Sequence, residues 1–268
     1  MIQYRLVATK VWLLVPLLAT AACSFQDETG GSRGRAKDVF DGVTLALAEA
    51  AERGDVRELE RLVTRGADIN APGKRGLTPL WWAVRTKNMR GSDWLLARGA
   101  NQNIKVEQQA LTIMQLAASY RNSEFLELLL RHQPKLEGPA AMASASAVNA
   151  AISARSRRNL ELLIRAGANL NGNADEMPAM ECACALAKYD FVLLMLESGA
   201  DFSRIWDVGA SAGQNRLVSA IRTRHIDPDS EAYIWRERVM RFLKARAIQT
   251  TYPPKEPPRT KPLPADLR

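Results

Sequence analysis

A serine with the local pattern of a hydrolytic nucleophile lies at position 211. Residues 209–213 read Gly-Ala-Ser-Ala-Gly, the G-x-S-x-G turn that can expose a serine hydroxyl for attack on an ester. That chemistry requires an acidic residue and then a histidine further along the chain, whereas the last histidine, His225, precedes the first later acid, Asp227. Because the motif lacks these partners, the sequence predicts no catalytic residue and no enzyme.

Two thiols are the next candidates for chemistry, because cysteines bind metals and form disulfides. Cys182 and Cys184 lie two positions apart on an expected helix, so their side chains point to different faces and do not bridge easily. No third ligand or nearby histidine completes a metal site. We therefore expect buried free thiols, with no metal and no cofactor.

Cys23 has the context of a cysteine that becomes acylated. Basic residues precede an apolar run over 11–18 that is too short to span a membrane, and small residues stand immediately before Cys23. This pattern resembles a bacterial lipobox. The resemblance implies a lipoprotein signal peptide over 1–22, a lipid anchor on Cys23 and, because Ser24 follows, a periplasmic protein held at the outer membrane. Ordinary secretion with a chance cysteine is the alternative.

The rest of the chain is organised by a repeated phrase in which Leu-Leu is followed, two residues later, by Gly-Ala. Gly66 and Gly99 of this phrase are 33 residues apart, and Gly167 and Gly199 are 32 apart, while Gln133 stands in a degenerate copy between them. A fixed period of this length indicates a stacked array of helix pairs. We expect the four glycines to adopt the left-handed backbone conformation that ends a helix.

A second phrase begins 21 residues before each of these positions. Before Gly99 it reads Thr-Pro-Leu-Trp-Trp-Ala over 78–83, which resembles the opening of an ankyrin repeat with tryptophan in place of the usual histidine. The resemblance implies an all-α ankyrin-repeat solenoid of about six helix-turn-helix repeats with short hairpin tips, over residues 38–249.

The segments outside this array have different compositions. Residues 23–37 are predicted to be a flexible membrane tether. Residues 250–268 contain six of the thirteen prolines and are predicted to form an extended tail, either disordered or lying on a partner. The formal net charge of +8 is a mild bias toward acidic partners or anionic lipid and does not indicate nucleic acid.

In ankyrin arrays the hairpin tips and the ends of the first helices form one protein-binding face. Aligning the repeats places a set of polar and aromatic residues there. Trp81 and Trp82 could instead pack between repeats, a role that is favoured for Trp81 and equally open for Trp82. The expected partner-binding set is Lys74, Arg75, Trp82, Arg85, Gln108, Gln109, Tyr120, Asp175 and Arg222.

Two functions follow from the combined resemblances. A lipoprotein signal with a short ankyrin array resembles the immunity proteins paired with type VI secreted phospholipase effectors, which implies a periplasmic protein that occludes a toxic lipase. The alternative is an envelope scaffold or stress-adaptor protein that holds an endogenous partner.

Overall fold

The computed structural model describes residues 34–104, 111–133, 139–171, 178–202, 216–222, 224–248 and 261–267. Within these ranges all regular structure is helical: there are thirteen α-helices, two short 3-10 helices and no strand. The described residues divide into two compact units, unit 1 ending at Gly167 and unit 2 beginning at Ala168. None of the described helices combines the length and apolar character that a membrane crossing needs.

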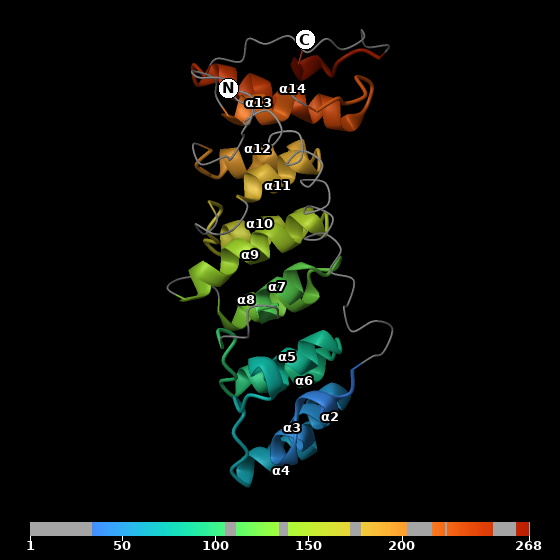
Figure 1. Cartoon of the computed structure of the whole chain (residues 1–268), viewed down its shortest axis with the longest axis vertical. Coiled ribbons are helices and arrows are strands. Elements are labelled where there is room, and N and C mark those ends of the chain that lie inside the picture. The colour runs from blue at the N-terminus through green and yellow to red at the C-terminus, as the bar shows by residue number, and fades with distance from the viewer. Residues whose placement is uncertain are drawn as a thin grey trace, which may run out of the picture. The chain divides into compact units, whose positions relative to one another are not determined.

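After a short first helix, α2 (Ala36–Val39), the helices form six pairs, and in the first five pairs the two helices contact each other (Figure 1). The pairs of unit 1 are α3 (Gly42–Arg53) with α4 (Val56–Thr64), α5 (Pro79–Arg85) with α6 (Met89–Ala97), α7 (Ile113–Ala118) with α8 (Glu124–His132), and α9 (Pro139–Ser153) with α10 (Arg157–Arg165). Those of unit 2 are α11 (Ala179–Ala185) with α12 (Tyr189–Glu197), and α13 (Arg216–Arg222) with α14 (Glu231–Ala245). This arrangement confirms the predicted all-α array of about six repeats.

The repeated phrases form these helices for identifiable reasons. The Thr78 hydroxyl accepts a hydrogen bond from the Trp81 backbone N–H at 3.2 Å, and Pro79 occupies the first turn, where its missing N–H costs nothing. The small Ala83 on the first helix and the Leu95 on the second are both fully buried. This pair therefore has a capped first helix and a buried stripe that is completed by packing against neighbouring pairs.

The left-handed positions are of two kinds. Gly66, Gly99, Gly167 and Gly199 all have positive φ, between 81° and 91°, as predicted. A second left-handed position, which the sequence analysis missed, lies in the turn between the two helices of a pair. Gly54 occupies it in the first pair, whereas Lys87, Arg155 and Ala187 occupy it later, with φ of 60°, 55° and 53°. Side chains with a β-carbon are strained there.

Asparagines after the second helices connect consecutive repeats. The side-chain carbonyl of Asn70 accepts a hydrogen bond from the Asn101 backbone N–H at 2.8 Å, and Asn171 makes the equivalent contact with Asp201 at 2.8 Å. Because each bond satisfies a loop N–H of the following repeat, these residues fix the spacing between neighbouring loops.

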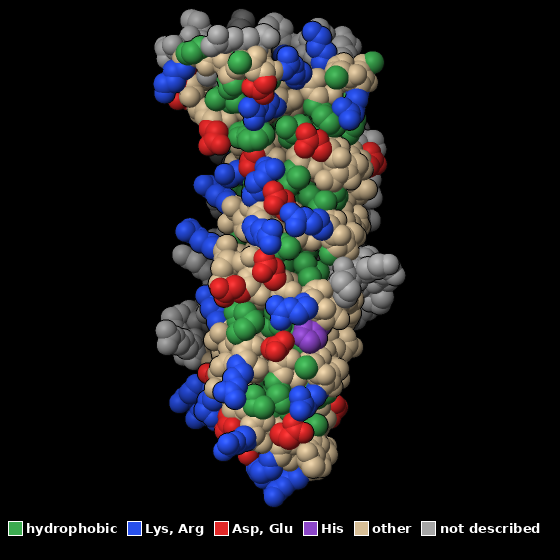
Figure 2. All heavy atoms as spheres, turned by 180° about the vertical axis from the view of Figure 1, so that it is seen from behind, with side chains coloured by type: hydrophobic (Ala, Val, Ile, Leu, Met, Phe, Trp, Pro, Cys, Tyr) green, Lys and Arg blue, Asp and Glu red, His purple; other side chains and the backbone are tan. Residues whose placement is uncertain are grey.

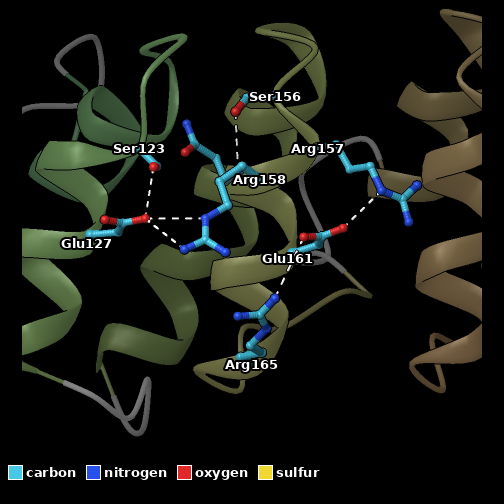
Figure 3. Close-up of polar contacts among 8 residues, drawn as sticks. Ser123, Glu127, Ser156, Arg157, Arg158, Glu161 and Arg165 are labelled. Carbon is cyan, nitrogen blue, oxygen red and sulfur yellow. Dashed lines mark hydrogen bonds and ion pairs between the residues drawn. The ribbon is translucent and has the colours of Figure 1, made fainter.

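The second helices of unit 1 are also joined by ion pairs. Glu60 pairs with Arg98 at 2.6 Å, and Glu127 on α8 pairs with Arg158 on α10 at 3.0 Å (Figure 3). Hydrogen bonds from Ser123 and then from Arg158 lower the pKa of Glu127. On the face shown in Figure 2, acidic and basic side chains alternate along unit 1 and do not gather into a patch of one sign. The ion pairs thus link successive repeats, although each exposed pair contributes little alone.

The folded part of the chain begins slightly earlier than the expected boundary at residue 38. Ala36 is only 3% exposed and packs in one cluster with Phe40, Ala48 and Leu77. Ala36 and Lys37, which were assigned to the tether, therefore already belong to α2, and the Ala36 side chain packs against the first repeats.

Candidate protein-binding face

The part of the predicted face that the structure describes in unit 1 consists of one hairpin and the ends of two helices. We call the inner face the surface formed by residues 74–75 of the hairpin, 85–87 at the end of α5, and Tyr120 after α7. Gln108, Gln109 and Asp175, three other members of the predicted set, lie outside the described residues. Arg222 is on α13 in unit 2.

A tight hairpin presents Lys74 and Arg75. The Gly73 N–H donates to the Leu77 carbonyl at 2.7 Å, which closes a turn in which Arg75 has φ of 61°. Both basic residues are exposed, and the Lys74 ammonium donates to the Asp38 carbonyl at 2.9 Å. The structure therefore places this part of the predicted set at the surface, held against α2.

Trp82 requires a correction, because it is a core residue. Its side chain is 2% exposed, its ring meets that of Phe40 edge-on at 5.9 Å, and its Nε1 donates to the Glu52 carboxylate at 2.7 Å. A side chain covered on this scale cannot anchor a partner without unfolding its surroundings. Trp81 is partly buried and donates through Nε1 to the Leu111 carbonyl at 2.7 Å, which is the packing role favoured for it.

Arg85 lies beside this tryptophan core. Its guanidinium carbon is 5.1 Å from the centroid of the Trp82 ring, in a cation–π arrangement. The residue is half-buried, so part of it remains accessible at the surface. Stacking on a buried ring restricts the side chain and reduces the entropy lost on binding.

Tyr120 is fixed by three contacts. Its hydroxyl donates to the Val84 carbonyl at 3.0 Å, and its ring meets Phe125 edge-on at 5.8 Å. The Lys87 ammonium lies 4.9 Å from the ring centroid. Burial raises the pKa of Tyr120 to about 12, against a smaller opposing effect of Arg85, so the phenol is neutral near pH 7.

Lys87 is the inner-face residue that the sequence analysis missed. It is exposed, it has φ of 60°, and its ammonium adds to the positive charge that Arg85 places near Tyr120. The available signal was its position: Lys87 lies 33 residues after Gly54, in the slot where a glycine would be unstrained. Its exposure and its contact with the Tyr120 ring place Lys87 in the candidate set.

The residues with candidate chemistry are two thiols and two residues outside the described ranges. Burial raises the pKa of the Cys184 thiol to about 12, which keeps it protonated near pH 7. Cys182 is half-buried, whereas the sequence predicted both thiols to be buried. Within the described ranges no group of three or more His, Cys, Asp or Glu residues could hold a metal ion. Ser211 and Cys23 lie outside those ranges.

Comparisons with known proteins identify the repeat class. Residues 47–139 match the family model of ankyrin repeats in three copies. The ankyrin repeat domain of Bcl-3 has a similar fold, with a TM-score of 0.57 and 19% identity over 76% of this chain and 86% of that one. The human ASB11 ankyrin repeat domain has a TM-score of 0.53 and 20% identity over 78% and 86%. Residues 47–139 are therefore similar to ankyrin repeats, a class of module that binds other proteins, and the similarity to the solved structures concerns the fold.

The relatives by sequence are much longer proteins. The nuclear factor NF-kappa-B p105 subunit of Gallus gallus is 29% identical over 169 residues, or 58% of this chain and 17% of its own length. The mitochondrial disaggregase of Bos taurus is 30% identical over 128 residues, or 46% of this chain and 18% of its own length. The chain thus spans less than a fifth of the length of these two relatives.

Proposed function

We propose that this protein binds a partner protein through the inner face of unit 1, and that it does so as a lipid-anchored immunity protein that neutralises a type VI secreted phospholipase in the bacterial periplasm. One observation carries the binding role: Arg85, Lys87 and Tyr120, from two consecutive repeats, meet on one surface and are held there by rings and backbone carbonyls. A surface arranged before binding loses little entropy when a partner docks.

The mode of action is occlusion. Arginine and tyrosine are common in the residues that dominate protein interfaces, because they combine a large contact area with directional hydrogen bonds. A phospholipase bound to the inner face is inactivated if the complex blocks its access to lipid. This mechanism requires no catalytic group on the immunity protein.

The proposed location rests on the lipobox-like sequence before Cys23. Two or more acyl chains on that cysteine would anchor the protein stably, and Ser24 favours the outer membrane. Anchoring raises the effective concentration of the inhibitor at the membrane that the phospholipase attacks.

The test is an inhibition assay with the mature chain and a purified phospholipase effector encoded beside it. We expect stoichiometric inhibition that weakens by roughly tenfold or more when Arg85→Ala and Lys87→Ala are combined, which corresponds to about 1.4 kcal/mol or more. The matched control is Arg57→Ala with Arg90→Ala, which removes two exposed charges from the second helices. Inhibition should be unchanged in this control.

Two results would count against the proposal in different ways. Full inhibition by the Arg85/Lys87 double variant would exclude the inner face as the binding surface. Failure to inhibit any secreted phospholipase, together with stable binding of an endogenous envelope protein, would favour the scaffold or stress-adaptor function.

A further inference from the structure

The last helices of unit 2 line a half-open cavity that the protein-binding role does not use. It has a volume of about 300 Å³ and lies between α13, α14 and the segment 261–267, which ends in the 3-10 helix η2 (Ala265–Leu267). Figure 1 draws this C-terminal segment beside α14.

The segment 261–267 is fixed to unit 2 at two points. The Lys261 backbone N–H donates to the Asp229 carboxylate at 3.0 Å, and Asp266 pairs with Arg238 at 3.2 Å. The sequence analysis expected residues 250–268 to be an extended tail. The described part of that tail instead packs back against α14 and forms one wall of the cavity.

The lining is strongly basic. Of the described residues around the cavity, four are basic and only Glu237 is acidic. Arg236 is 2% exposed, and its guanidinium lies 3.5 Å from Glu237 and 4.3 Å from the centroid of the Tyr233 ring. The basic residues are Arg222, Arg236, Arg241 and Lys244.

Among these cations Arg236 is buried, and burial strengthens its field, whereas Arg241 and Lys244 are exposed. Charges shielded from water attract an anion more strongly than exposed charges do, because the local dielectric constant is lower. Guanidinium groups present paired N–H donors that match the oxygens of a phosphate group. Met240, Leu263 and Leu267 form an apolar part of the same lining. The cavity thus offers anion-binding donors beside a surface for carbon atoms.

We propose that this cavity binds a phosphate group carried by a small organic molecule or by a phospholipid, with the phosphate at the basic side chains and the attached carbon atoms against Met240, Leu263 and Leu267. The structure places Arg222, predicted from the sequence to contact a protein partner, at this cavity. The proposal is independent of the inner face, because every lining residue belongs to unit 2.

The test uses the mature chain carrying Cys23→Ser, so that no acyl group attaches it to lipid. Calorimetry with inorganic phosphate and with glycerol 3-phosphate measures binding of the free group. Co-sedimentation with phosphatidylcholine vesicles, with and without phosphatidylglycerol, measures binding of the anionic phospholipid. The variant is Arg241→Gln with Lys244→Gln, because these two residues are exposed and their replacement spares the buried Arg236.

We expect saturable binding in one arm of the experiment, weakened by roughly tenfold in the double variant. The control Arg57→Gln with Arg90→Gln lowers the net charge equally and should bind as the unsubstituted chain does. Binding of glycerol 3-phosphate assigns the site to a free phosphate ester, and binding only of phosphatidylglycerol vesicles assigns it to a lipid. Absence of binding in both arms, or equal loss in the variant and the control, would overturn the proposal, provided that circular dichroism shows both variants folded.

Discussion

The Lys87 ammonium lies 4.9 Å from the centroid of the Tyr120 ring, so a strained residue of one repeat covers an aromatic residue of the next. The Tyr120 hydroxyl in turn donates to the Val84 carbonyl at 3.0 Å. These two contacts run between the same pair of repeats. The cation–π contact offsets part of the strain of a lysine in a left-handed position, where a glycine would be unstrained.

Replacing strained residues by glycine separates the energetic cost of left-handed strain from the stabilising contact between Lys87 and Tyr120. Arg155→Gly should stabilise the protein by about 0.5–1 kcal/mol, because relief of the left-handed strain exceeds the entropy that glycine loses. Lys87→Gly should gain much less, since it also removes a cation–π contact of about 0.5–1 kcal/mol. Urea unfolding of both variants measures the difference. Equal gains would show that the contact with Tyr120 contributes nothing to stability.

A β-branched residue at Gly99 tests the repeat-ending turn. Gly99 has φ of 84° and no atom lies within 4 Å of an added β-carbon, so only backbone strain opposes a side chain. Gly99→Val should therefore destabilise the protein by about 1–3 kcal/mol, measured by urea unfolding. Gly99→Ala is the matched smaller change. An unaltered unfolding midpoint in Gly99→Val would contradict the assignment.

The pKa of Glu127 predicts how stability depends on pH. Its folded-state pKa is lowered, first by the hydrogen bond from Ser123 and then by that from Arg158. The ionised Glu127 carboxylate therefore stabilises the folded protein above the ordinary carboxyl pKa. This stabilisation is lost as falling pH protonates Glu127 in the folded state. Glu127→Gln should be less stable than the unsubstituted chain at about pH 7 and should approach it below about pH 4. A constant difference across this range would contradict the prediction.

If Cys23 is acylated as predicted, replacing it should change the cellular fraction in which the protein is found. Cys23→Ser should remove the lipid acceptor, so the protein should be found in the soluble fraction or remain unprocessed. Membrane fractionation with immunodetection measures this. If the variant fractionates with membranes as the unsubstituted chain does, the lipobox interpretation is wrong.

Local periodicity made most of the fold predictable, because most repeats carry buried leucines and a turn glycine at fixed spacing. Gly66 and Gly99 could be placed in left-handed turns from spacing alone, as the structure confirms. The burial of Trp82 could not be predicted from spacing, because its ring packs against Phe40, which lies outside the recognisable repeat. The contacts of the proline-rich end could not be predicted either, because no periodic pattern in the sequence relates Asp266 to its ion-pair partner Arg238.

The bonds that connect successive repeats of unit 1 also affect how this unit folds. Asn101 bonds to Asn70, Arg98 to Glu60 and Tyr120 to Val84, with separations of 31, 38 and 36 residues. Each bond thus closes a loop about one repeat long, which keeps the contact order low. Folding can then nucleate at any adjoining pair of repeats and propagate along the unit, with each new repeat docking on one already formed.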